Sequence, residues 1–242
     1  MAPPKIGNGA EVGPLQPSHG HEVDALLAAT RDLPRRVHPT AAAVEQQRHH
    51  HSRMEGRGAA LLVIGGEEVA SFLLAGGHRR FRLVLGTIGV STSDDRERGF
   101  TRRLAKAGFK ITLRLHGHST YEGGHAAGCR VAALSPEERP DAVFVLNDIM
   151  AMGFLDASRE AGLRVPDDLS VVGFDDVPAA ARRSYALTTV AQPMQAMVRR
   201  GLDLLAARIL DPTLPDETVT LRGRLVIRAS ARKPATGHEP TA

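Results

Sequence analysis

The sequence contains no tryptophan, a single cysteine and no long apolar run. With Cys129 alone, an intrachain disulfide is impossible, and this cysteine usage fits a reducing compartment. No stretch approaches the roughly 20 consecutive apolar residues that a membrane-spanning helix needs. The first 20 residues also lack the basic start and the apolar middle of a signal peptide. We therefore expect a cytoplasmic protein with no membrane partner.

Signals of enzymatic chemistry are also missing. The sequence shows no nucleophile–base–acid arrangement, and its glycine pairs lack the spacing and the lysine of a phosphate-binding loop. The histidines of 48–52 and 116–118 have no acid or cysteine at ligand spacing, so we expect no metal site. These observations predict a protein that is not an enzyme and that uses no cofactor. The net charge of +4 comes from scattered basic residues, which permits nucleic-acid binding without indicating it.

Composition divides the chain into three segments. Residues 1–58 are rich in Pro, Gly, His and Arg and read as irregular and largely disordered, apart from a short amphipathic helix expected over 21–33. Residues 59–231 have the regular apolar pattern of a folded domain. The tail 232–242 is again expected to be disordered.

Strands and helices alternate regularly in the central segment. We predict strands over 81–86, 109–115, 142–146 and 169–174, and helices over 67–77, 94–108, 121–134 and 147–163. This alternation is typical of βαβ units, so the fold class is α/β, with a parallel sheet flanked by helices on both faces.

Polar side chains follow two of the buried strands directly. Asn147 and Asp148 come after one strand, and Asp175 and Asp176 come after the next. Ligands of open α/β sheets bind at the carboxyl ends of the strands. Carboxylates and amides there can hydrogen-bond a polyhydroxylated ligand. We expect Asn147 and Asp175 to contact a ligand, and Asp148 and Asp176 to cap the helices that follow them.

Several motifs resemble the effector-binding region of LacI/GalR-type transcriptional regulators. They include VFVLNDIMAMG, GLRVPDDLSVVGFDD and LTTVAQP, and the resemblance covers roughly residues 60–231. It implies a periplasmic-binding-protein-like fold of two lobes that closes on a small-molecule effector, a sugar or related metabolite, and thereby controls binding to operator DNA. It also implies that Arg96, Asn147 and Asp175 contact the effector. Ser119 stands where the family usually has an aromatic ring, and Tyr121 is a candidate to replace that ring.

The N-terminal part of the chain differs from the family pattern. No helix-turn-helix headpiece is recognisable in 1–58, so operator binding requires a headpiece from elsewhere. By the resemblance, residues 65–187 correspond to a nearly complete second lobe, whereas the first lobe is incomplete and we expect its strands to be missing. The segment 188–193 leads to a helix with an apolar stripe whose first-lobe partner is missing, formed by Met194, Met197, Val198, Leu202, Leu205 and Ile209.

Three readings of the whole chain follow. The first is a regulator's effector-sensing module, either cut short or acting alone beside intact relatives. The second is a sugar-binding protein of a transport system, and the third is a truncated regulator without function. The helix over 148–161 is apolar nearly all round in its first turns. We therefore predict a homodimer through Ile149, Met150 and Met152.

Overall fold

The computed structural model describes residues 59–87, 91–111 and 113–234. The helix predicted over 21–33, the irregular segment 1–58 and the histidines of 48–52 lie outside these residues, as does most of the tail 232–242. The domain boundaries suggested by composition therefore stay predictions.

A four-stranded parallel sheet forms the centre of the second lobe, with its strands in the order β3-β2-β4-β5. The strands are β2 (Phe81–Leu85), β3 (Arg114–His116), β4 (Ala142–Val145) and β5 (Ser170–Val172). Both β4 and β5 are buried along their whole length, as expected for a sheet covered on both faces. The predicted parallel sheet is confirmed, although the strand expected over 109–115 is short and begins at Arg114.

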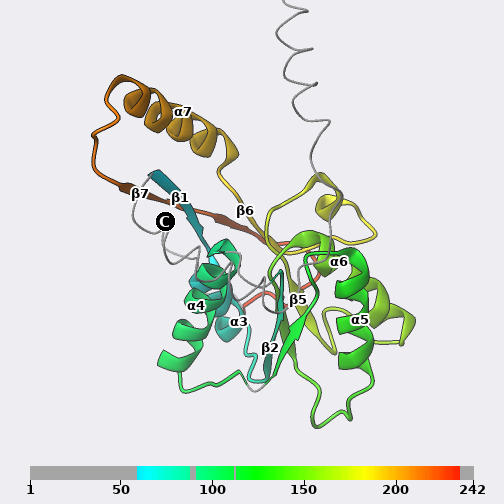
Figure 1. Ribbon diagram of the computed structural model, residues 1–242. Coiled ribbons are helices and arrows are strands. Elements are labelled where there is room, and N and C mark those ends of the chain that lie inside the picture. The colour runs from blue at the N-terminus through cyan, green and yellow to red at the C-terminus, as the bar shows by residue number, and fades with distance from the viewer. Residues whose placement is uncertain (1–58, 88–90, 112, 235–242) are drawn as a thin grey trace, which may run out of the picture. The chain divides into compact units, whose positions relative to one another are not determined.

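Two pairs of helices cover this sheet, as Figure 1 shows. The pairs are α3 (Gly66–Ala75) with α4 (Ser91–Lys106), and α5 (Tyr121–Ala132) with α6 (Asp148–Glu160). Phe100 and Leu104 of α4, which the sequence places toward the core, are fully buried. The Phe100 ring lies 5.0 Å from the Phe144 ring of β4, centroid to centroid, so α4 is anchored on the middle of the sheet.

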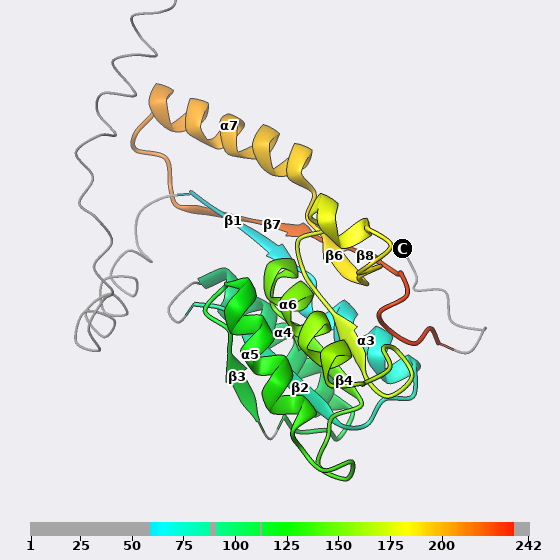
Figure 2. The same cartoon turned by 90° about the vertical axis from the view of Figure 1, so that its right-hand side faces the viewer.

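Glycines let α5 and α6 approach each other closely (Figure 2). A Cβ added at Gly124 would lie 2.0 Å from the backbone oxygen of Met150, and one added at Gly153 would lie 2.1 Å from that of Tyr121. No side chain fits at those distances. The glycines of α5, which weaken a helix by their propensity, are therefore required by its contact with α6.

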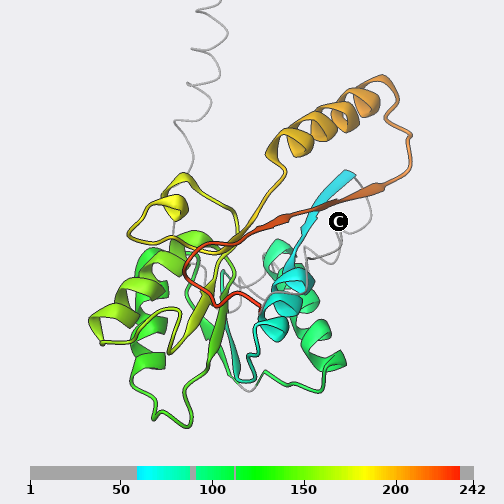
Figure 3. The same cartoon turned by 180° about the vertical axis from the view of Figure 1, so that it is seen from behind.

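Two further strands pair outside this sheet, and neither was predicted from the sequence. They are β1 (Ala59–Ile64) and β7 (Glu217–Arg222), and they pair in parallel. Next to them, β6 (Thr189–Ala191) pairs antiparallel with β8 (Arg224–Val226). In Figure 3, β7 continues into β8 as one extended stretch. This pairing was not predicted from the sequence, although apolar Val219 and Leu221 alternate with polar residues in β7.

Helix α7 (Met194–Leu210) has no buried residue. Its apolar stripe is exposed except at the partly buried Met197: the exposed fractions are 58% for Met194, 57% for Val198, 61% for Leu202, 58% for Leu205 and 71% for Ile209. A pocket between α7 and β7 is lined by Gln195, Arg199 and Leu221, among others. Within the described ranges, no helix combines the length and apolar character needed to cross a membrane.

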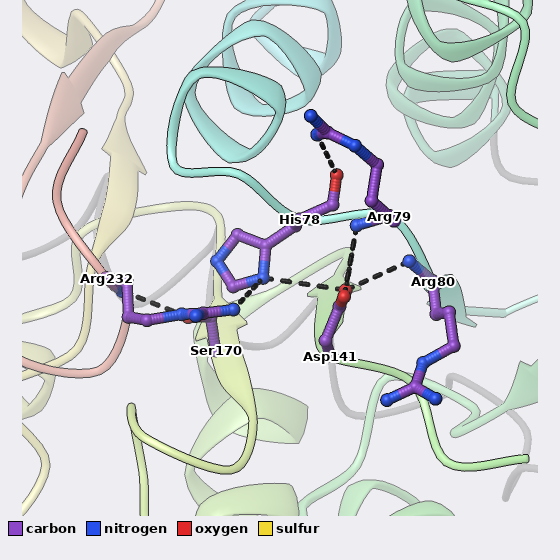
Figure 4. A network of polar contacts seen from close by, with 6 residues as sticks. All are labelled: His78, Arg79, Arg80, Asp141, Ser170 and Arg232. Atoms are coloured by element: carbon purple, nitrogen blue, oxygen red, sulfur yellow. Dashed lines mark hydrogen bonds and ion pairs between the residues drawn. The ribbon is translucent and has the colours of Figure 1, made fainter. Parts of the chain in front are cut away.

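A polar network holds the amino-terminal end of the sheet (Figure 4). Asp141 accepts hydrogen bonds from the backbone N–H groups of Arg79 and Arg80. The buried His78 ring lies beside it, with Nδ1 3.5 Å from Oδ1 of Asp141, and Nη2 of Arg232 donates to the same ring nitrogen at 3.0 Å. Arg232 also donates its backbone N–H to Oγ of Ser170. The network fastens the last described segment to the start of three strands.

Candidate functional site

Arg96 and Asp175 come together at the carboxyl ends of β4 and β5. Arg96 projects from α4, and its Nη1 donates to the backbone oxygen of Leu146, directly before Asn147, at 2.7 Å. Its Nη2 lies 3.4 Å from Oδ1 of Asp175. The three residues named by the family resemblance therefore lie at one edge of the sheet, where ligands of α/β folds bind.

The guanidinium of Arg96 is nearly enclosed, with 11% of the side chain exposed. It lies over the Phe174 ring, with Cζ 3.8 Å from the ring centroid, a favourable cation–π contact. Burial lowers the pKa of Arg96 from its usual value, and the carboxylates of Asp175 and Asp148 oppose this effect. Its buried Nε has no hydrogen-bond partner among the described residues, so the group keeps unused donor capacity.

Asp175 has a strained backbone, with φ at +124°. Its N–H donates to the backbone oxygen of Val190 at 2.9 Å, and its Oδ1 accepts from Nε2 of Gln192 at 2.6 Å. Burial raises the pKa of the Asp175 carboxyl, while Arg96 and then Gln192 act in the opposite direction. A strained, partly desolvated carboxylate that is held in place on several sides is typical of a functional site.

Asn147 is the N-cap residue of α6, because its Oδ1 accepts the backbone N–H of Met150 at 2.8 Å. Capping uses only the side-chain oxygen. The NH₂ group donates to none of the described residues and is available to a ligand. The cap is thus at Asn147 and not at Asp148, where the sequence predicted it.

Asp148 instead accepts two hydrogen bonds inside the protein. Oγ1 of Thr189 donates to one oxygen at 2.6 Å and the backbone N–H of Val177 donates to the other at 2.9 Å. Burial raises the pKa of Asp148 to about 6, against the lowering effect of these two bonds. Asp148 therefore links the start of α6 to Val177 and to β6.

Asp176 does not cap a helix either, which corrects the second capping prediction. It pairs with Nη2 of Arg228 at 2.6 Å, and the short helix after it (Pro178–Ala181) begins behind Val177. Thr189, Gln192 and Arg228 were all missed by the sequence analysis. Each contacts one of the acids from a distant part of the chain, and no local pattern signals such a contact.

The two secondary candidates lie in different surroundings. Ser119 is exposed in the loop after β3, with φ at +60°, and its Oγ accepts the backbone N–H of Thr87 at 3.1 Å. Tyr121 directs its hydroxyl away to α6, where it donates to Oδ2 of Asp156 at 2.8 Å. This bond raises the pKa of Tyr121 to about 12. The Tyr121 ring is therefore engaged with α6 and is not brought to Arg96 and Asp175.

The predicted dimer face of α6 is only partly exposed. Ile149 is 41% exposed, but Met150 is fully buried and Met152 is 6% exposed. The backbone of Met150 lies against Gly124 of α5, and its Sδ lies against Gly117, where an added Cβ would come within 2.6 Å. The expectation that all three side chains lie on an open face is therefore wrong for the two methionines, which are buried within the chain.

Comparisons with known proteins identify the family of this chain. Residues 70–231 match the protein family described as "Periplasmic binding protein-like domain". The HTH-type transcriptional repressor PurR of Edwardsiella ictaluri is 37% identical over 161 residues, which are 66% of this chain and 47% of that repressor. The chain spans about half the length of the curated relatives it matches. These relatives are transcriptional regulators, in agreement with the prediction that the chain is not an enzyme.

Solved structures of LacI-family regulators are also similar to this chain. A regulatory protein of the LacI family from Chloroflexus aggregans is 30% identical, with a TM-score of 0.64, over 76% of this chain and 71% of that one. A LacI family transcriptional regulator from Lactobacillus casei with bound sucrose is 25% identical, with a TM-score of 0.61, over 86% of this chain and 91% of that one.

Proposed function

Because the chain belongs to the family of periplasmic binding protein-like domains, in the form that LacI-type regulators carry, we propose that it is the effector-sensing part of a transcriptional regulator. Its effector is a small polyhydroxylated molecule, a sugar or a related metabolite. The effector binds at the carboxyl ends of β4 and β5, against Arg96, Asn147 and Asp175.

The contact of Arg96 with Asp175 carries this proposal. Its Nη2–Oδ1 separation of 3.4 Å is longer than a direct hydrogen bond, so neither group is fully satisfied by the other. Adjacent hydroxyls of a sugar can accept from the guanidinium and donate to the carboxylate at once. The free NH₂ group of Asn147 adds a further donor beside them.

The same residues supply a route from effector to lobe closure. Asp175 bonds Val190 and Gln192, and Asp148 bonds Thr189, so both acids contact the segment that crosses toward the first lobe. An effector that engages Asp175 changes these contacts and shifts the balance between lobe orientations. In a regulator this shift controls operator DNA binding, with the headpiece supplied by a further segment or by an intact relative, in the cytoplasm.

The sucrose complex of the Lactobacillus casei regulator supports a sugar as the ligand class. The relatives named as repressors support a regulator over a transport protein. Self-association through the exposed Ile149 is the form of dimer that we retain from the sequence prediction.

A calorimetric titration of the full chain against pentoses, hexoses, their phosphates and nucleosides tests the assignment. We expect one class to bind, and we expect Asn147→Ala and Asp175→Ala to abolish that binding. Asp168→Ala is the matched control, because Asp168 is a partly exposed acid that pairs with Arg164. Binding that survives both site variants would place the effector elsewhere.

A further inference from the structure

The single cysteine of the chain belongs to a three-residue arrangement on the surface of α5 and α6. Cys129 is exposed, and its Sγ lies 3.7 Å from Nδ1 of His125, one turn earlier on α5. The other ring nitrogen of His125, Nε2, lies 2.9 Å from Oε2 of Glu160, the last residue of α6. A thiol, an imidazole and a carboxylate are thus aligned in order.

The packing of the two helices fixes this alignment. Residues four apart on a helix are neighbours on its surface, which places the thiol beside the imidazole. Glu160 reaches the ring because α5 and α6 touch almost backbone to backbone. A Cβ added at Gly128 would lie 2.7 Å from Cβ of Ala157 and 2.8 Å from the backbone oxygen of Phe154. The three side chains are therefore held by two helices, α5 and α6, that are too closely packed to shift along each other.

The carboxylate determines which ring nitrogen carries the hydrogen. An ionised Glu160 can only accept, so Nε2 of His125 is the protonated nitrogen of the neutral ring. Nδ1 then presents its lone pair to Cys129 and can take the thiol proton. A nucleophile beside a base that a third group orients is the arrangement that activates thiols.

We propose that Cys129 is a site of thiol–disulfide exchange with low-molecular-weight disulfides. His125 removes the thiol proton, and the thiolate attacks one sulfur of the small disulfide. A new S–S bond forms at Cys129, the S–S bond of the small molecule breaks, and the released thiolate takes up the proton. The small disulfide is the oxidant, so Cys129 is oxidised to a mixed disulfide while half of the small molecule is reduced to a thiol.

This site is separate from the effector site. Arg96 comes from α4, which covers the opposite face of the sheet from α5 and α6 (Figure 1). The arrangement does not suit a metal ion, because Cys129 and Glu160 lie against opposite nitrogens of the His125 ring. No cluster suited to a metal ion is found among the residues that the structure describes.

The test is the rate at which the folded chain reacts with dipyridyl disulfide, an uncharged probe whose released thione is followed by absorbance. The same chain unfolded in urea provides the rate of the thiol without its neighbours. We expect the folded chain to react about tenfold faster, His125→Gln to remove this advantage and Glu160→Gln to remove part of it. His116→Gln, which changes an exposed histidine at the end of β3, should leave the rate unchanged.

Mass spectrometry should find one pyridyl adduct per chain, and none in Cys129→Ser. In urea all variants that keep the cysteine should react equally, and their melting temperatures establish that each variant is folded in buffer. A folded chain that reacts no faster than the unfolded one, or a His125→Gln variant as fast as the original, would overturn the proposal. A Glu160→Gln variant with an unchanged rate would overturn the positioning role of Glu160.

Discussion

Nη2 of Arg96 lies 3.4 Å from Oδ1 of Asp175, and the same oxygen accepts a hydrogen bond from Gln192. One carboxylate oxygen therefore contacts both α4 and the segment that leads from β6 to α7. A ligand that takes over either contact alters both. In the proposed function, Asp175 therefore contacts both the effector and the segment whose position changes with lobe orientation.

The backbone strain at Asp175 predicts a difference in stability between two variants that both lack the carboxylate. A side chain at φ +124° is costly, whereas glycine adopts this conformation freely. Asp175→Gly should therefore be more stable than Asp175→Ala by about 1–2 kcal/mol in urea unfolding. Both variants should fail to bind the effector. Equal stabilities would mean that the backbone at this position is not strained.

The raised pKa of Asp148 predicts that the free energy of unfolding falls as the pH rises. Its folded-state pKa of about 6 lies above the ordinary 3.8, so the folded chain holds this proton more tightly than the unfolded chain does. The resulting stability is present below pH 4 and is lost as the pH rises through 6. Between pH 4 and 7 the free energy of unfolding should fall by about 2 kcal/mol from this group.

The control for this prediction is Asp148→Asn. The variant loses one accepted hydrogen bond and should be less stable overall, but the contribution from position 148 should no longer vary with pH. Urea unfolding of both proteins across the range gives the difference between their profiles. Parallel profiles would contradict the raised pKa of Asp148.

Because the apolar stripe of α7 is exposed, we predict that it tolerates a charged side chain without loss of stability. Leu202 is 61% exposed, so Leu202→Glu should change the free energy of unfolding by no more than about 0.5 kcal/mol and should reduce aggregation. Met197, which is partly buried against the core, provides the contrast, and Met197→Glu should cost clearly more. If Leu202→Glu unfolds the protein, then another segment covers this stripe in solution.

Self-association is best tested at Ile149. It is the exposed member of the predicted interface, so Ile149→Glu should convert a dimer to a monomer in analytical ultracentrifugation without loss of the melting transition. Met152→Glu is unsuitable, because that side chain is nearly buried within one chain. A dimer that persists in Ile149→Glu would rule out an interface through this residue.

Much of the second lobe could be predicted from the sequence, because its signals are local. Apolar runs mark β2, β4 and β5, and Gly108 and Gly162, both at positive φ, end the helices before them. The residues at the strand ends were predictable for the same reason. Asp175 follows a buried strand, and the carboxyl ends of parallel strands meet at one edge.

The remaining features depend on contacts between distant residues. The pairing of β1 with β7 joins opposite ends of the domain, and the short alternation of Val219 and Leu221 within β7 does not indicate which strand is its partner. The partners of the acids, such as Thr189 for Asp148, are likewise set by tertiary structure. The glycines of α5 looked like a weakness of the helix because α6, which requires them, comes from another part of the sequence.

The most direct test of the proposed function is the thermal melt of the full chain, alone and with each member of the sugar, sugar phosphate and nucleoside panel. A ligand that binds only the folded state must raise the melting temperature. We predict a cooperative transition that one ligand class raises, and no rise for Asp175→Ala with that ligand. A transition that no member of the panel moves, or a rise that persists in Asp175→Ala, would contradict an effector site at Arg96 and Asp175.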